Sequence, residues 1–242
     1  MRRAANRIEF IALVALALAG CARATSSLPA AGIRVMTYNI HAGQDAAQQR
    51  NLERVAELIK QAGADIVLLQ EIDRRTQRAA GVDHLAELER LTGMHAAFGK
   101  SLDYQGGDYG IALLSRWPLD SARVVPLAVT PPQARSENRY EPRVGLYAQV
   151  RTPVGRWHVL NTHLDPAGEP TYRHQEIVGL LAFARRMVPE NEPLILGGDL
   201  NAREDAPEIA ALNLIFVDSW RRCGDRGPGH SRRTRPTGAS TT

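Results

Sequence analysis

Short apolar runs alternate along the chain with segments of helical periodicity. Ile33 and Val35 alternate with polar residues as in a half-buried strand. Leu52, Val55 and Ile59 share one helical face and predict a helix over residues 50–61 that ends at a glycine. The same patterns predict further helices over residues 82–93 and 173–187, and further strands over residues 66–69, 109–115, 144–150, 156–162 and 194–196.

Helices separate some of these strands, whereas others follow one another closely. Trp117 and Pro118 break the chain after one strand, and Pro153 to Gly155 forms a tight turn between two others. Hairpin-like pairs beside helix-separated strands predict an α/β fold with mixed sheets rather than an all-parallel sheet.

Four polar motifs stand where apolar strands are expected to end. Catalytic groups collect at strand ends in layered α/β folds, because rigid strands hold loop residues in fixed positions. Asn, Glu, His and Asp side chains suit a hard divalent cation and a phosphate better than thiol or acyl chemistry. We therefore expect one site from Thr37-Tyr38-Asn39-Ile40-His41, Leu69-Gln70-Glu71, Asn161-Thr162-His163-Leu164 and Gly197-Gly198-Asp199-Leu200-Asn201.

The composition is that of an ordinary globular protein, but the net charge of +4 is unevenly distributed. The first twenty residues carry +2 and the last twelve carry +3, which leaves −1 for residues 21–230. A strong nucleic-acid binder usually has a basic body, so nucleic acid is not the favoured partner. A local basic patch at Arg74, Arg75 and Arg78 stays open.

The first twenty residues have the features of a targeting segment. Three arginines precede a mostly apolar stretch, Ile8 to Ala19, that is too short to span a bilayer comfortably. It ends in Leu18-Ala19-Gly20-Cys21, which resembles the bacterial lipoprotein cleavage box and predicts acylation of Cys21. A plain secretory signal or an uncleaved anchor are the alternatives. We expect a signal peptide over residues 1–20, a tether over residues 21–32, and an extracytoplasmic lipoprotein held on a membrane, the outer membrane if the host is Gram-negative.

Residues 33–220 resemble the endonuclease/exonuclease/phosphatase superfamily. The ordered set of four motifs carries the resemblance, together with Tyr109-Gly110-Ile111-Ala112-Leu113-Leu114-Ser115-Arg116 between the second and third. The resemblance implies a four-layer α/β sandwich, in which two mixed sheets are flanked by helices and the site lies at their shared edge. It also implies Mg²⁺- or Mn²⁺-dependent cleavage of a phosphoester.

The resemblance assigns a role to each candidate residue. It makes Glu71 the metal carboxylate and Asn39 its partner at the metal. The alternatives are an ion pair at a strand end for Glu71 and an Asx turn for Asn39. Asp199 and Asn201 match the pair that positions the attacking water and the scissile phosphate, although Gly197-Gly198-Asp199 is also good turn chemistry. His163 matches a histidine that donates a hydrogen bond to phosphate, with a satisfied structural histidine as the alternative. Further candidates for substrate or phosphate contact are Tyr109, Arg143 and His41. The alternative for Tyr109 is a place in the core, and the alternative for Arg143 and His41 is an ordinary surface position.

The chain departs from the family pattern near its C-terminus. An Arg-Ile-Asp-Tyr-Ile-Phe-like strand and a Ser-Asp-His strand are expected and are not present, so we predict a domain over residues 33–230 that lacks its terminal strands, and an aberrant tail over residues 231–242. We interpret this tail as a frameshifted translation. Read from the third base of the His230 codon, a GC-rich codon choice gives Phe-Pro-Ala-Asp-Ala-Pro-Asp-Arg-Arg-Ile-Asp-Tyr. Loss of the Asp-His pair predicts poor activity or stability.

These expectations lead to a lipid-anchored, metal-dependent phosphoesterase that we expect to be monomeric. Its substrate would be a phosphodiester, whether nucleic acid, phospholipid or a small molecule. The alternative is a degraded, non-catalytic lipoprotein that binds phosphate or a partner.

Overall fold

The structure is a computed structural model that describes residues 32–45, 47–132, 141–167, 170–219 and 222. The chain divides into two units, residues 1–32 and 33–242. The predicted signal peptide, Cys21 and the predicted tail lie outside the described residues. Within the described part of the chain, no helix is both long and apolar enough to cross a membrane.

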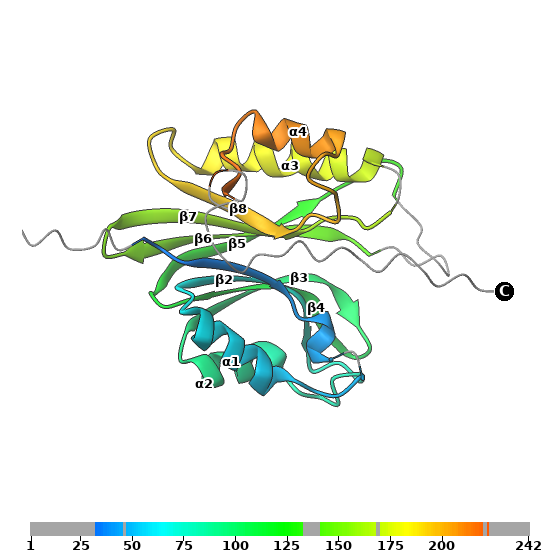
Figure 1. Cartoon of the computed structure of the whole chain (residues 1–242). Helices are drawn as coiled ribbons and strands as arrows, with labels where there is room; N and C mark the ends of the chain where they lie inside the picture. Colours follow the sequence, from blue (N-terminus) through cyan, green and yellow to red (C-terminus); the bar gives the residue numbers. More distant parts are fainter. Residues whose placement is uncertain (1–31, 46, 133–140, 168–169, 220–221, 223–242) are drawn as a thin grey trace, which may run out of the picture. The chain divides into compact units, whose positions relative to one another are not determined.

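In the described residues, eight strands form two sheets of four (Figure 1). The first sheet has the order β1-β2-β4-β3, with β1 (Val35–Asn39) parallel to β2 (Ile66–Arg74) and antiparallel pairing of β4 (Gly107–Ser115) with β2 and β3 (His95–Tyr104). The second has the order β5-β6-β7-β8, with antiparallel pairing through β5 (Leu119–Leu127), β6 (Arg143–Thr152) and β7 (Gly155–His163), and β8 (Leu194–Asp199) parallel to β7. Both sheets are mixed, as the sequence predicts.

The sheets pack face to face, and helices cover their outer faces (Figure 1). One core cluster lies between the sheets and includes Leu68, Leu113, Leu146 and Val159. The helices α1 (Leu52–Ala62) and α2 (His84–Thr92) share a second cluster with the first sheet, and α3 (Pro170–Met187) and α4 (Pro207–Asn213) share a third with the second sheet. The predicted four-layer α/β sandwich is confirmed.

Local sequence explains most element boundaries. The helices α1 and α2 end at Gly63 and Gly93, which adopt the left-handed conformation that glycine accepts without strain. The first residues of α2 are capped by Asp83, whose carboxylate accepts from the Ala86 N–H. The break predicted at Trp117-Pro118 separates β4 from β5.

One predicted strand end is wrong. Three motifs do end strands, at Asn39, His163 and Asp199. The second motif does not, because β2 continues through Glu71 to Arg74. The pairing of β2 with β4 shifts register between Leu69 and Ile72, and Glu71 sits in this β-bulge with a φ of 60°. The bulge aims its side chain without ending the strand.

Asn161 joins the two sheets through buried hydrogen bonds. It lies on β7, and its amide nitrogen donates to the carbonyls of Leu69 on β2 and Ala112 on β4, both at 2.9 Å. Its amide oxygen accepts from Gln70 Nε2, also at 2.9 Å. Asn161 is fully buried and Gln70 nearly so. The backbone carbonyls beside the bulge thus find their partner on the opposite sheet.

Replacing Asn161 by leucine is expected to destabilise the protein by on the order of 3 kcal/mol, because two buried carbonyls and the Gln70 amide lose their partner. Urea unfolding at unchanged m-value measures this loss as a lower midpoint. The exposed Asn191→Leu change is the matched control and should leave the midpoint in place. A midpoint for Asn161→Leu equal to that of the control would contradict the role given to these bonds.

Candidate active site

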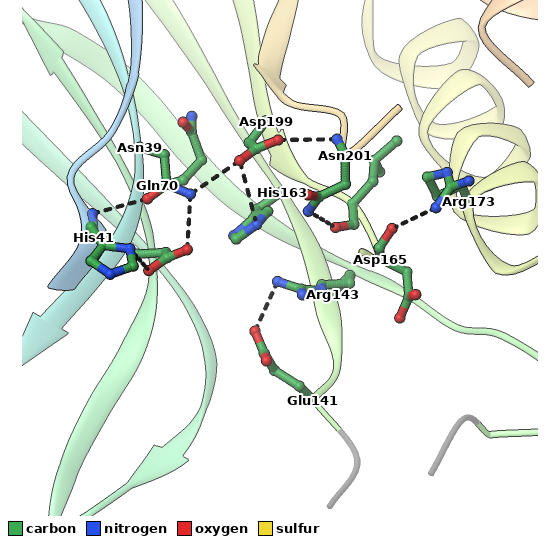
Figure 2. Close-up of polar contacts among 12 residues, drawn as sticks. Asn39, His41, Gln70, Glu141, Arg143, His163, Asp165, Arg173, Asp199 and Asn201 are labelled. Carbon is green, nitrogen blue, oxygen red and sulfur yellow. Dashed lines mark hydrogen bonds and ion pairs between the residues drawn. The ribbon is translucent and has the colours of Figure 1, made fainter. Parts of the chain in front are cut away.

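Side chains from both sheets meet in one polar chain at the ends of β1, β7 and β8. Asn39 Nδ2 donates to Glu71 Oε1 at 2.8 Å and to Asp199 Oδ2 at 3.0 Å. His163 Nε2 lies 3.9 Å from the same Asp199 oxygen. Two carboxylates far apart in the sequence therefore share one amide nitrogen, and Figure 2 shows Asn39, Asp199 and His163 turned toward one another.

Backbone geometry fixes the orientation of the Asp199 carboxylate. Its Oδ1 accepts from the Asn201 N–H at 3.0 Å, and Asn201 has a φ of 48°. Asn201 Nδ2 in turn donates to the Leu164 carbonyl at 2.8 Å. The preceding Gly198 has a φ of 138°, and a Cβ there would lie 2.0 Å from the Thr162 carbonyl oxygen. Glycine is required here by the close approach of β7 to β8.

His41 lies at the rim of the site. Its ring Nδ1 is 3.8 Å from Glu71 Oε2, and 71% of its side chain is exposed. Its backbone N–H donates to Asn39 Oδ1 at 3.0 Å. The turn that carries it, η1 (His41–Gly43), packs on the buried ring of His84, which a Cβ at Gly43 would meet at 2.9 Å.

Arg143 and Tyr109 are buried rather than exposed. The Arg143 guanidinium pairs with Glu141 at 2.8 Å (Figure 2), and its Nε is buried with no hydrogen-bond partner among the described residues. Burial, followed by the negative charges of Glu141 and Glu71, raises the pKa of the Tyr109 hydroxyl, so this group stays protonated. The Tyr109 hydroxyl thus remains a hydrogen-bond donor that feels the charges of Glu141, Glu71 and Arg143.

A cavity of about 710 Å³ opens beside Asn39 and Asp199. Among the described residues that line it none is aromatic, and the one cation, Arg203, is 3.2 Å from the Asp205 carboxylate. The lining residues are Thr37, Asn39, Gln70, Gly198, Asp199, Leu200, Asn201, Ala202, Arg203, Glu204, Ile209 and Asp218.

The donor set suits a hard ion with few protein ligands. Nowhere in residues 32–45, 47–132, 141–167 and 170–219 do three or more His, Cys, Asp or Glu side chains form a group that could hold a metal. Mg²⁺ usually keeps several waters and takes only one or two carboxylates, and Glu71 and Asp199 lie on either side of a single nitrogen. Asn39 turns its NH₂ toward both carboxylates, so its oxygen faces the His41 N–H instead.

The Endonuclease/Exonuclease/phosphatase family model matches residues 36–242. The chain belongs to this family. It is therefore a phosphoesterase-type hydrolase, and enzymes of the family generally use divalent metals.

Several proteins of known sequence or structure are similar to this chain. The uncharacterized protein YbhP of Escherichia coli K12 is 27% identical over 204 residues, which cover 78% of this chain and 76% of YbhP. An endonuclease/exonuclease/phosphatase from Beutenbergia cavernae is 27% identical with a TM-score of 0.57; the match covers 72% of this chain and 49% of that one, so it spans about half of the relative. A functionally unknown conserved protein from Enterococcus faecalis is 20% identical with a TM-score of 0.62, covering 77% and 74% of the two chains.

The sequence-based hypothesis missed the supporting residues. It assigned no role to Gln70 or Asn161, although both stand inside the quoted motifs. A polar side chain within an apolar strand must find a hydrogen-bond partner when it is buried. The polar residues Gln70 and Asn161 inside apolar runs are therefore the signal that indicates these contacts. Glu208 of α4 pairs with the buried Arg173 of α3 at 2.7 Å. This contact has no such signal, because the sequence patterns do not predict α4.

The buried His84 predicts a pH dependence of stability. Burial lowers the pKa of the His84 ring. The negative charge of Asp73 opposes this shift, and the positive charge of Arg50 adds to it. The unfolded chain therefore takes up this proton first, so stability is complete above about pH 6.5 and falls as the pH drops toward the lower folded-state pKa.

Between pH 7 and pH 5 the free energy of unfolding should fall less steeply in His84→Gln than in the wild type, as urea titrations at several pH values would show. The exposed His95 provides the control, since His95→Gln should follow the wild-type curve. Parallel curves for all three proteins would refute this assignment.

Proposed function

We propose that the protein is an extracytoplasmic, lipid-anchored phosphodiesterase that depends on Mg²⁺ or Mn²⁺. The observation that carries the catalytic part of this proposal is the shared contact of Glu71 and Asp199 with Asn39 Nδ2. This contact places the two carboxylates close together, and the His163 imidazole lies beside Asp199. Cleavage of a phosphoester needs these groups in one place.

The protein residues have distinct parts in the proposed reaction. Glu71 would hold the ion, with Asn39 beside it after a turn of its amide. The ion, when bound, supplies Lewis-acid stabilisation of the phosphate oxygens. Asp199 orients the attacking water and accepts its proton while His163 donates a hydrogen bond to a phosphate oxygen. The bond from phosphorus to the ester oxygen breaks, and the leaving alkoxide takes its proton from solvent.

Asn201, Tyr109, Arg143 and His41 complete the proposed site. Asn201 fixes Asp199 through its backbone N–H. Tyr109 remains a donor because its pKa is raised, and Arg143 would exchange Glu141 for a substrate phosphate. His41, at the exposed rim, would contact the part of the substrate that leaves the site.

The charges around the site favour a small polar phosphodiester or a lipid headgroup over nucleic acid. Arg78 is bound to Asp73 at 2.6 Å and Arg74 to Asp83 at 2.8 Å, so most of the basic patch is already neutralised. The described lining of the cavity also offers no aromatic surface on which a base could stack.

Mg²⁺ titration with bis(p-nitrophenyl) phosphate tests the catalytic proposal. We expect Glu71→Ala to lower the metal-dependent rate by about 10²–10⁴-fold, because the ion loses its carboxylate. The control Glu57→Ala removes an exposed carboxylate on α1 and should be neutral. Equal rates for the two variants, or no metal dependence in the wild type, would favour the non-catalytic binder.

The lipid anchor is tested separately. In cells labelled with an alkyne fatty acid, the wild type should carry the label and sediment with membranes, whereas Cys21→Ser should lose the label. Label retained by Cys21→Ser would place the modification elsewhere, and an unlabelled wild type would show that the segment is an ordinary signal or anchor.

A further inference from the structure

The loop that follows His163 is held by buried charges that the proposed reaction does not use. Arg173, near the start of α3, donates from Nε to Glu208 Oε1 of α4 at 2.7 Å. Its Nη1 donates to the carbonyl of Asp165 at 3.1 Å and to that of Ala167. Arg173 and Glu208 are 6% and 3% exposed. One guanidinium thus ties two helices to residues 164–167, here called the His163 loop.

The other side of the His163 loop contacts the active-site residues directly. The Leu164 N–H donates to the Asp199 backbone carbonyl at 2.9 Å, and the Leu164 carbonyl accepts from Asn201 Nδ2 at 2.8 Å. The Asp165 N–H donates to the Glu176 carboxylate of α3 at 2.8 Å. A shift of this loop would therefore move His163 and Asn201 together (Figure 2 shows Arg173 beside Asp165).

Stability alone does not account for a buried Arg–Glu pair. Such a pair costs desolvation free energy, and apolar replacements of similar volume are often as stable or more so. A guanidinium offers something that an apolar pair cannot, namely donors in a rigid planar fork that fix the positions of several acceptors at once. Here the acceptors are one carboxylate and two carbonyls of the loop.

We propose that Arg173 and Glu208 are positioning residues that set the places of His163 and Asn201 through the His163 loop. The proposal rests on the phosphodiesterase function given above. Neither residue contacts the substrate in this account. Glu208 fixes the guanidinium, the guanidinium fixes the loop carbonyls, and the loop fixes the two active-site side chains.

The test compares the full-length wild type with Arg173→Met/Glu208→Leu, Arg173→Lys and the exposed control Arg186→Met on the same helix. For each protein one measures the melting temperature, kcat and KM with Mg²⁺ and bis(p-nitrophenyl) phosphate, and amide hydrogen exchange of residues 162–167. We expect the double variant to melt near the wild type while its kcat falls about 10–100-fold at nearly unchanged KM, with faster exchange in the loop. Arg173→Lys should keep the fold and still lose kcat, because an ammonium lacks the fork.

Unchanged kcat and unchanged loop exchange in a folded double variant would overturn the proposal. If the double variant does not fold, Arg173→Lys and the isosteric Glu208→Gln decide by the same readouts. If the wild type shows no metal-dependent hydrolysis, the proposed function fails, but positioning is still judged by loop exchange and by the His163 ring resonance. Both should change in the variants and stay unchanged in Arg186→Met, and no change in either measurement overturns it.

Discussion

The buried amide of Asn161 fixes how the two sheets meet, and the candidate active site depends on that register. Glu71 belongs to one sheet and Asp199 to the other, so neither sheet alone contains the site. Asn161 donates to a carbonyl on each of two strands of the opposite sheet and accepts from Gln70, the residue before Glu71. Apolar contacts between the sheets are non-directional, whereas these three hydrogen bonds permit only one alignment.

The bulge in β2 works together with this inter-sheet contact. A regular strand would continue the alternation of inward and outward side chains past Leu69. The register shift and the left-handed backbone of Glu71 interrupt that alternation and turn the carboxylate toward Asn39. A left-handed backbone at a non-glycine residue such as Glu71 persists only when the surrounding structure holds it in place. Here the hydrogen bonds of Asn161 to Leu69 and Gln70 lie immediately beside it.

The family resemblance implied the four layers, and local patterns and motifs indicated many elements and the candidate site residues, but not the contacts that support them. The helical faces of α1 and α3, the buried strands and the terminal glycines have strong local patterns. In contrast, β3 and β5 are edge strands whose exposed positions hide the alternation, and β5 includes Pro126 and several charged or polar residues. Asn39, Glu71, His163 and Asp199 stand in the four motifs, and the resemblance assigned their roles. The bulge, the Asn161 bonds and the Arg173–Glu208 pair arise from contacts between distant segments, which no local pattern contains.

We expect an ion bound by Glu71 to lie within reach of His163, although the two residues come from different sheets. Paramagnetic broadening of the His163 ring resonance by substoichiometric Mn²⁺ measures this directly. We expect strong broadening in the wild type that is lost in Glu71→Ala and retained in Glu57→Ala. Equal broadening in wild type and Glu71→Ala, or none in either, would show that the ion is not held where the two sheets bring these side chains together.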